Sequence, residues 1–254
     1  MEYVAMPPRA AELASVVECV WMCRRPGATG TESVLPSGRA QLVIGLDASH
    51  RFASFVGPLT RPRTIESAAQ RRAIGVVFRP GGLTAVTGWA ASDAADDDVG
   101  LDAVTRIDVT DLLEHLCNVP SAVGAVDAVE RVLCSQLAMV DRAPSGEVWR
   151  AIRSLENGAT VPDAAANAGA APRRLRRTFR DEVGMTPKRF ARLQRFRVAL
   201  SSVRARPVRP LAEVAVASGY ADQAHMTRDF VEFGGVTPGA IHGDGSSTPT
   251  HLAG

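Results

Sequence analysis

The sequence contains little cysteine, and its cysteines follow no regular spacing. Among 254 residues there are four, at Cys19, Cys23, Cys117 and Cys134. These thiols are too few for the disulfide framework of a small secreted domain, and they lack the paired Cys-x-x-Cys spacing of structural zinc sites. We therefore expect buried, reduced thiols, with no metal site and no cofactor.

The sequence also lacks a long apolar run near its start. Glu2, Arg9 and Glu18 interrupt the first 25 residues, so no segment there approaches the roughly 18 apolar residues of a membrane span, and no basic-then-apolar leader is visible. An apolar content of 46% and a mean hydropathy of +0.01 are typical of a soluble globular protein. We expect a cytoplasmic protein of two domains without membrane contact.

Net charge is small, at +2, but it is unevenly divided along the chain. Residues 145–243 hold 16 Arg and Lys against 9 Asp and Glu, which gives +7, and the remaining residues carry −5. A basic surface confined to one part of a chain is typical of a nucleic-acid binder. The charge distribution therefore places the DNA-binding or RNA-binding surface in the C-terminal part.

The N-terminal part consists of short apolar runs separated by turns. Runs of β-branched and aromatic residues occupy positions 40–46, 51–56 and 73–78, and Gly57-Pro58 and Pro80 punctuate them. Short strands with such punctuation are typical of a small β-sandwich or barrel. We predict a β-rich domain over residues 1–103.

The apolar period becomes helical after this point. The spacing of apolar residues from Val109 to Val140 predicts connecting helices in the segment 104–144, and residues 141–146 read as a linker from this segment into the C-terminal domain. Residues 145–243 read as helices separated by short turns, and 244–254 form a tail that has nothing to bury and is expected to be disordered. The predicted fold class is α+β, with an all-α C-terminal domain.

Residues 161–187 and 211–238 are two copies of one pattern. Val161-Pro-Asp-Ala-Ala165 aligns with Leu211-Ala-Glu-Val-Ala215 at an offset of 50, and Phe179 aligns with Phe230 at an offset of 51. In each copy a short Ala-rich helix, a glycine turn and a second helix precede Gly-x-Thr-Pro. This order is the sequence form of a helix-turn-helix unit.

The second helix of each copy has one packing face and one polar face. In the first copy the arginines at 173, 176, 177 and 180 fall within an arc of about 100°, away from Leu175, Phe179 and Val183. In the second copy Ala224, Thr227 and Arg228 lie opposite Met226, Phe230 and Phe233. One such helix alone would more often be a solvated surface, but two copies in register favour insertion into the major groove of DNA.

The segment Gly219-Tyr-Ala-Asp-Gln-Ala-His-Met-Thr-Arg-Asp-Phe230, followed by Gly235-Val-Thr-Pro238, resembles the signature of the AraC/XylS DNA-binding domain. The first copy and the intervening helix, predicted over Lys188–Val203, follow the same family. The resemblance implies a sequence-specific transcriptional regulator rather than an enzyme. It implies two helix-turn-helix units, joined by a long helix, that place recognition helices in successive major grooves of double-stranded DNA, and it leaves RNA polymerase open as a partner.

The resemblance also assigns DNA-binding candidates by position. They are Arg173, Arg176, Arg177 and Arg180 in the first unit and Gln223, Ala224, His225, Thr227 and Arg228 in the second. The family commonly has Ser or Thr before the first recognition helix, but this sequence has Ala171 followed by Pro172, which removes a side-chain cap worth roughly 1 kcal/mol. Because Asp222 stands in the cap position of the second unit, we expect the first unit to be the less stable one.

The N-terminal part resembles the sensor-like domain that precedes this module in one AraC-like subgroup. The matching segments are 34–38, 55–63 and 75–82, although the subgroup's usual Leu-Pro-Asp-Gly is Leu35-Pro-Ser-Gly38 here. In the regulator that gives the family its name, the corresponding domain is a cupin-like barrel that binds a small molecule and dimerises. The resemblance therefore implies a small-molecule effector and leaves a homodimer open.

Three features of the N-terminal part have both a functional and a structural interpretation. Arg61, Arg63 and Arg79 suit an anionic effector, although arginines beside proline and glycine more often brace loops. Trp21 suits either a pocket wall or a core position. The run at 96–98 has three adjacent aspartates, which on a loop are more often solvated than bound to a metal.

Two other classes of function are weighed against a specific regulator. A DNA-repair regulator that joins a zinc-bound, methyl-accepting cysteine to an AraC-type module needs four thiolates on zinc, and the cysteine spacing does not favour it. A non-specific architectural DNA binder is disfavoured by Gln223 and Arg228, which suit base reading. The sequence indicates neither the effector, nor the operator, nor the direction of regulation.

Overall fold

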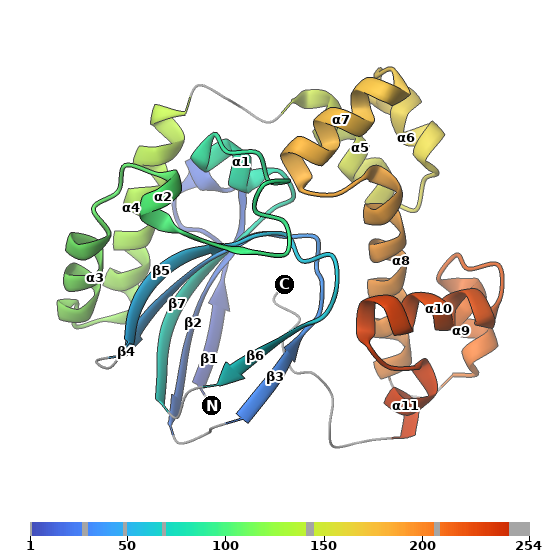
Figure 1. Ribbon diagram of the computed structural model, residues 1–254, viewed down its shortest axis with the longest axis horizontal. Coiled ribbons are helices and arrows are strands. Elements are labelled where there is room, and N and C mark those ends of the chain that lie inside the picture. The colour runs from blue at the N-terminus through green and yellow to red at the C-terminus, as the bar shows by residue number, and fades with distance from the viewer. Residues whose placement is uncertain are drawn as a thin grey trace.

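The computed structural model describes residues 2–26, 30–47, 50–67, 70–140, 145–205 and 209–243. Strands dominate the N-terminal half and helices form the C-terminal half, in agreement with the predicted α+β class (Figure 1). None of the helices in these ranges combines the length and the hydropathy of a membrane span. Most of the predicted linker, at 141–144, and the predicted disordered tail, at 244–254, lie outside the described residues.

An antiparallel six-stranded sheet forms the centre of the N-terminal half, which we call the sheet half. Across the sheet, its strands are β1 (Glu2–Met6), β2 (Val17–Pro26), β7 (Gln70–Phe78), β4 (Gln41–Asp47), β5 (His50–Val56) and β8 (Asp98–Gly100). A separate sheet pairs β3 (Gly30–Val34) with β6 (Arg63–Ser67). The three apolar runs of the sequence are β7, β4 and β5, which are neighbours in the larger sheet.

Helices cover one face of the six-stranded sheet (Figure 1). Leu112 and Leu116 of α3 (Val109–Asn118) and Leu133 of α4 (Ala122–Met139) are buried in the same core as the sheet residues. The segment predicted as connecting helices therefore also completes the core of the sheet half. Three short helices complete this half, η1 (Ala11–Leu13), α1 (Gly82–Thr87) and α2 (Leu101–Val104).

The C-terminal half consists of helices separated by short turns, as predicted for residues 145–243, and we call it the helical half. They are α5 (Gly146–Glu156), α6 (Val161–Ala168), α7 (Pro172–Val183), α8 (Pro187–Arg204), α9 (Leu211–Ala217), α10 (Gln223–Gly234) and α11 (Pro238–Gly243). The two repeat copies are the helix pairs α6–α7 and α9–α10, which we call the first and second units. The predicted spacer helix is α8, which runs between them (Figure 1).

Both units are anchored on α8 by aromatic side chains. Phe179 of α7 meets Phe190 edge-on at a centroid distance of 5.5 Å, and Phe230 of α10 meets Phe196 edge-on at 5.0 Å. All four rings are fully buried. The turns that precede the recognition helices contain Gly169 with φ 66° and Gly219 with φ 78°, as the positions of these glycines predict.

The two halves share a contact at the turn that contains Leu35. Leu35 is buried in the hydrophobic core of the helical half, although it belongs to the sheet half in sequence. A Cβ added at Gly38 would lie 3.3 Å from the Leu193 side chain, so this turn packs directly on α8. Ser37, which stands where the subgroup has Asp, is buried, and its Oγ accepts a hydrogen bond from the Arg39 N–H at 3.3 Å. The serine therefore supports the turn.

Candidate nucleic-acid interface

The first recognition helix, α7, presents a row of exposed arginines. Leu175, Phe179 and Val183 are buried, whereas the predicted positions 173, 176, 177 and 180 are all exposed. Within the described residues, no ion pair is found for any of these four arginines. Arg174 on the same helix differs, because it pairs with Glu147 of α5. The free cationic face of α7 is therefore available to a polyanion.

The start of α7 has the geometry that the sequence predicts. Ala171 is the N-cap residue, no side chain caps the first turn, and Pro172 follows in the first helical position. The first helix of the same unit, α6, is capped instead, because the Thr160 Oγ1 accepts a hydrogen bond from the Asp163 N–H at 3.3 Å.

The second recognition helix, α10, presents a mixed polar surface. Gln223, Ala224 and Arg228 are exposed, and His225 and Thr227 are half-buried. The Asp222 carboxylate accepts a hydrogen bond from the His225 N–H at 2.6 Å, which is the predicted N-cap.

Two of the predicted DNA-contact residues also contact other residues of their own unit. The His225 ring packs edge-on against Tyr220 at 5.2 Å, and the Thr227 hydroxyl donates to the Gln223 carbonyl oxygen at 2.9 Å. Gln223, Ala224 and Arg228 are consequently the predicted residues of α10 whose side chains are exposed to a ligand.

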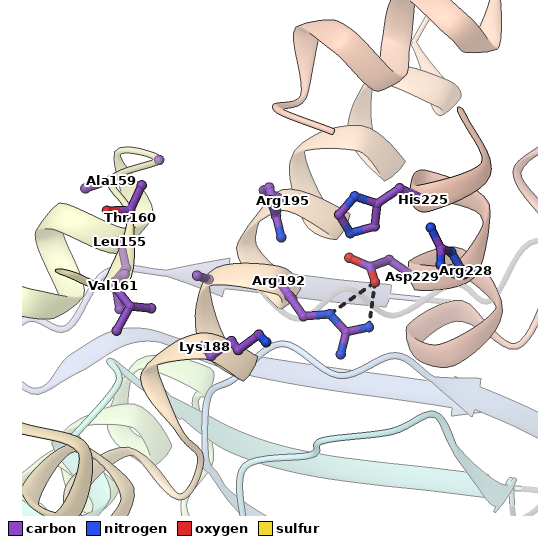
Figure 2. Close-up of a pocket in the computed structure, with 12 residues that line it drawn as sticks. Leu155, Ala159, Thr160, Val161, Lys188, Arg192, Arg195, His225, Arg228 and Asp229 are labelled. Carbon is purple, nitrogen blue, oxygen red and sulfur yellow. Dashed lines mark hydrogen bonds and ion pairs between the residues drawn. The ribbon is translucent and has the colours of Figure 1, made fainter. Parts of the chain in front are cut away.

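A hollow of about 650 Å³ separates the two units above α8. The turn from Leu155 to Val161 forms its wall on the side of the first unit, and His225, Arg228 and Asp229 form the opposite wall (Figure 2). Between the walls α8 contributes Lys188, Ala191, Arg192 and Arg195. The hollow therefore lies between the turn that leads into the first unit and the recognition helix α10 of the second, and basic side chains line its floor.

One acidic residue, Asp229, neutralises part of the positive charge in this hollow. Asp229 is fully buried, and its Oδ1 accepts hydrogen bonds from Arg192 Nε at 3.2 Å and Nη2 at 2.6 Å (Figure 2). Arg192 also pairs with Glu232, and its guanidinium lies over the Phe233 ring at 5.2 Å. Burial raises the pKa of the Tyr220 hydroxyl, and the nearby Asp229 carboxylate raises it further, so this phenol stays protonated. Arg192 and Asp229 thus attach α10 to α8.

The residues of this junction carry no recognisable local signal in the sequence. Asp229 lies inside the family-like signature, but its partner Arg192 is 37 residues away. Lys188 at the start of α8 was also missed; it is exposed, and no salt bridge of Lys188 is found in the part of the chain that the structure describes. The +7 charge of this region was the one signal that could have indicated them.

The ambiguous arginines and aspartates of the sheet half mostly brace loops. Arg63 forms two hydrogen bonds to the Asp98 carboxylate, at 2.6 and 2.7 Å, and Arg79 Nε donates to the Ala14 carbonyl oxygen at 3.1 Å. The Asp96 carboxylate accepts hydrogen bonds from Thr60. The acidic run is therefore partly structural, whereas a solvated loop was the more frequent expectation.

All four cysteines lie in the described ranges, where none forms a disulfide, and each is half-buried, so the expectation of buried thiols was too strong. Cys19 and Cys23 lie on β2, Cys117 lies on α3 and Cys134 lies on α4. Cys19 and Cys23 alternate with Val20 and Met22, which pack in the core, so they face the other side of the sheet. Within the described ranges, no three His, Cys, Asp or Glu side chains gather into a group that suits a metal ion.

The chain matches two protein families, one in each half. Residues 150–242 match the family described as "Helix-turn-helix domain", which is of the AraC type, and residues 5–100 match the family described as "Domain of unknown function (DUF6597)". No curated protein matches the chain significantly in sequence.

Solved structures of ToxT from Vibrio cholerae are similar over almost the whole chain. The 1.65 Å structure is 8% identical, covers 95% of this chain and 96% of its own, and has a TM-score of 0.43. ToxT bound to (E)-4-(8-methylnaphthalen-1-yl)but-3-enoic acid is 9% identical, covers 95% of this chain and 97% of its own, and has a TM-score of 0.41. The helical half is thus a DNA-binding domain of the AraC helix-turn-helix type with two exposed recognition helices, and the protein is a DNA-binding transcriptional regulator.

Proposed function

We propose that this regulator reads a specific DNA site by placing α7 and α10 in successive major grooves. The observation that carries the proposal is the repeated geometry: each unit packs its recognition helix on α8 through buried phenylalanines and exposes the opposite face. The exposed faces carry arginines that have no ion pair among the described residues. A cationic helix face joined rigidly to a second one suits two adjacent grooves of a duplex.

In the first unit we propose that Arg173, Arg176 and Arg177 contact base edges or phosphates, and that Arg180 contacts phosphates from the last turns of α7. A guanidinium donates two hydrogen bonds to guanine O6 and N7, or pairs with a phosphate, and all four side chains are exposed for either contact. Because one helix carries four arginines for which no ion pair is found among the described residues, this unit supplies the larger share of electrostatic attraction to DNA.

In the second unit we propose that α10 discriminates between bases. Gln223 suits the N6 and N7 atoms of adenine, Arg228 suits guanine, and the methyl group of Ala224 suits the thymine methyl. Thr227 contacts the same groove with its remaining acceptor lone pairs, and His225 approaches from the side of the hollow. Lys188, at the floor of the hollow, is proposed to contact a phosphate between the two grooves.

Selection of bound sites from a random DNA library tests this proposal. At one fixed salt concentration, the full chain should bind the selected site at least roughly a thousandfold more tightly than random DNA. Equal affinity would instead identify a non-specific architectural binder. Metal analysis and a methyl-transfer assay test the repair alternative, which requires stoichiometric zinc.

We propose further that the sheet half holds a small-molecule effector against the face opposite α3 and α4. The Trp21 ring lies over Gly75 and the Phe52 ring lies over Gly45, where a Cβ would collide with them. Trp21 also stacks with Tyr3 at a centroid distance of 6.1 Å. The Trp21 indole Nε1 is buried without a hydrogen-bond partner among the described residues, so a ligand acceptor that displaces the ring from Gly75 would satisfy it.

A panel of small apolar and aromatic metabolites bearing a hydrogen-bond acceptor tests the effector proposal. A compound that changes DNA affinity of the full chain should lose this effect in W21F, which keeps an aromatic ring but removes the donor. W89F serves as the matched control because Trp89 is exposed. An unchanged response in W21F would contradict the assignment. A homodimer and a contact with RNA polymerase stay predictions.

A further inference from the structure

One loop of the sheet half lies against the carboxyl ends of both recognition helices. This loop, residues 57–62, follows β5 on the side of the sheet half that faces α8 (Figure 1). A Cβ added at Gly184, just after α7, would lie 2.9 Å from the Pro58 ring. A Cβ at Gly235, just after α10, would lie 4.0 Å from the Pro62 ring. The loop therefore spans the distance between the two helix ends.

The middle of the loop binds both α8 and α10 through one side chain. Arg189 of α8 donates from Nη2 to the Thr60 carbonyl oxygen at 2.6 Å, although these residues are 129 positions apart in sequence. Arg189 Nη1 also pairs with Glu232 of α10 at 3.0 Å, and the guanidinium lies over Phe233 at 5.3 Å. A displacement of Thr60 would therefore reach α8 and α10 together.

The loop has a defined shape because residues behind it hold it. Asp96 has φ 62°, an unusual conformation for a residue other than glycine, and its carboxylate accepts hydrogen bonds from the Thr60 N–H at 2.6 Å and the Thr60 hydroxyl at 2.5 Å. The Gly57 N–H donates to the Asp97 carbonyl oxygen at 2.9 Å, and there is no space for a Cβ at Gly57 beside Ala94. A strained residue held by several contacts often marks a functional position.

The sheet half also binds the last turn of α7. The Ala91 N–H donates to the Asp181 carbonyl oxygen at 2.7 Å, and the Thr84 hydroxyl donates to the Glu182 carbonyl oxygen at 3.4 Å. The last carbonyl groups of a helix have no partner within the helix, so these contacts satisfy them. They fix the end of α7 to the same body that carries the 57–62 loop.

We propose that the 57–62 loop, braced by Asp96, sets the separation of α7 and α10 and thereby selects the spacing between the two half-sites in DNA. This inference rests on the proposed function, because spacing has meaning only if both helices read bases. Two recognition helices held at a fixed separation fit one half-site spacing, whereas two loosely held recognition helices tolerate several spacings. Asp96 and Arg189 are therefore positioning residues, and neither is assigned a contact with DNA.

Asp96→Gly is the informative variant, because Asp96 lies away from both recognition helices. Glycine adopts the same backbone conformation without strain but removes both acceptors of Thr60. Asp96→Asn keeps one acceptor oxygen and tolerates the left-handed conformation, so it should behave close to the wild type. Asp93→Asn is the matched charge control, since Asp93 is exposed and, among the described residues, its side chain accepts a hydrogen bond only from the Ser92 hydroxyl.

The first measurement needs no DNA. Amino acids with a keto side chain are placed at exposed positions 176 and 224 and coupled to spin labels. The labels report the distance between α7 and α10 in the full chain. We expect Asp96→Gly to broaden or shift the distance distribution, and Asp93→Asn to leave it unchanged. A distribution in Asp96→Gly equal to that of the wild type overturns the proposal, whatever the chain does on DNA.

The second measurement uses unlabelled variants and the selected DNA site, with one base pair inserted or removed between its halves. Asp96→Gly should reduce the preference for the native spacing roughly tenfold, which corresponds to about 1.4 kcal/mol, while base preferences within each half stay the same. Unchanged spacing preference in a variant with an altered distance distribution also overturns the proposal. A wild-type chain without any preferred site contradicts the proposed function instead, and the distance measurement then decides the role of the loop alone.

Discussion

The two helix-turn-helix units share one sequence pattern but differ in what they expose. On α7 the first unit presents four exposed arginines for which no ion pair is found among the described residues, whereas on α10 the second presents Gln223, Ala224 and a single arginine, Arg228. In proteins that bind DNA, cations give affinity for any sequence, and side chains with paired donors and acceptors distinguish bases. The comparison indicates a division of labour, with attraction in the first unit and discrimination in the second.

The units also differ in what supports them. The first unit has an uncapped recognition helix, but the sheet half contacts the end of that helix at Asp181 and Glu182. The second unit has a capped recognition helix, which Arg192 and Asp229 attach to α8. The capping of the first helices is reversed, since Thr160 caps α6 and no side chain caps α9. The sheet half thus hydrogen-bonds directly to the recognition helix of the first unit, whereas it reaches the second unit through Arg189 and through Pro62 beside Gly235.

The largest expected effect comes from removing the aromatic anchor of the second unit. Phe230→Ala should cost about 3–5 kcal/mol of unfolding free energy, because the ring is fully buried against Phe196. Hydrogen exchange should become faster in α9–α11 and stay slow in α6–α7, which the sheet half supports. Val231→Ala, at an exposed neighbour, should change stability by less than about 0.5 kcal/mol. If both units lose protection from hydrogen exchange equally, the two units are not stabilised separately.

The charge difference between the units is tested by neutralising α7. The triple variant R173Q/R176Q/R177Q should weaken binding to every DNA sequence and lower the slope of log affinity against log salt by up to about 0.9 per arginine. Arg131→Gln on α4 is the control, since Arg131 is exposed in the sheet half. If the slope stays at the wild-type value, α7 does not supply the electrostatic attraction.

Discrimination by the second unit is tested at Arg228. We expect Arg228→Ala to lose roughly 1–3 kcal/mol at one base pair and to relax the preference there. An alternative in which Arg228 pairs on its own helix is not favoured, because Asp222 caps the helix and Glu232 pairs with Arg189 and Arg192. Affinity for every single-base variant of the site decides between base reading and phosphate contact, since a phosphate contact predicts a uniform loss.

The smallest expected effects come from exchanging the caps of the recognition helices. Asp222→Ala should cost about 1 kcal/mol of stability, and Ala171→Ser should add up to about 1 kcal/mol, since each change removes or supplies one hydrogen bond to the first turn. Chemical denaturation measures both. If Ala171→Ser gives no gain, Pro172 and the contacts of α7 with the sheet half already compensate for the missing cap.

The sequence predicted the strands and helices whose pattern of apolar residues lies within one short segment. The apolar runs at β4, β5 and β7, and the periodic helices α3 to α10, were recognised in this way. Strand β2 was missed because Glu18, Cys19 and Arg24 interrupt its apolar pattern and its pairing register shifts between Val17 and Cys19. Helix α1 was missed because it follows Pro80-Gly-Gly, which is typical of a turn.

Local sequence patterns also predicted only part of the candidate DNA-binding site. Helical periodicity predicted which face of α7 and α10 is exposed, since a face depends only on residues three or four apart. It did not predict that Arg192 binds Asp229 or that Arg189 binds the Thr60 carbonyl group, because these partners lie 37 and 129 residues apart. Periodicity shows which side of a helix is buried, but the choice of partner depends on the packing of the whole chain.

A contact map of the selected DNA site tests most directly whether two unlike helices read it. Hydroxyl-radical footprints of the full chain should show two protected blocks on one face of the duplex, with centres about 10 base pairs apart. The α7 triple variant should erase mainly one block, and Arg228→Ala should weaken only the other. A single block, or the loss of the same block in both variants, would contradict the assignment of α7 and α10 to separate grooves.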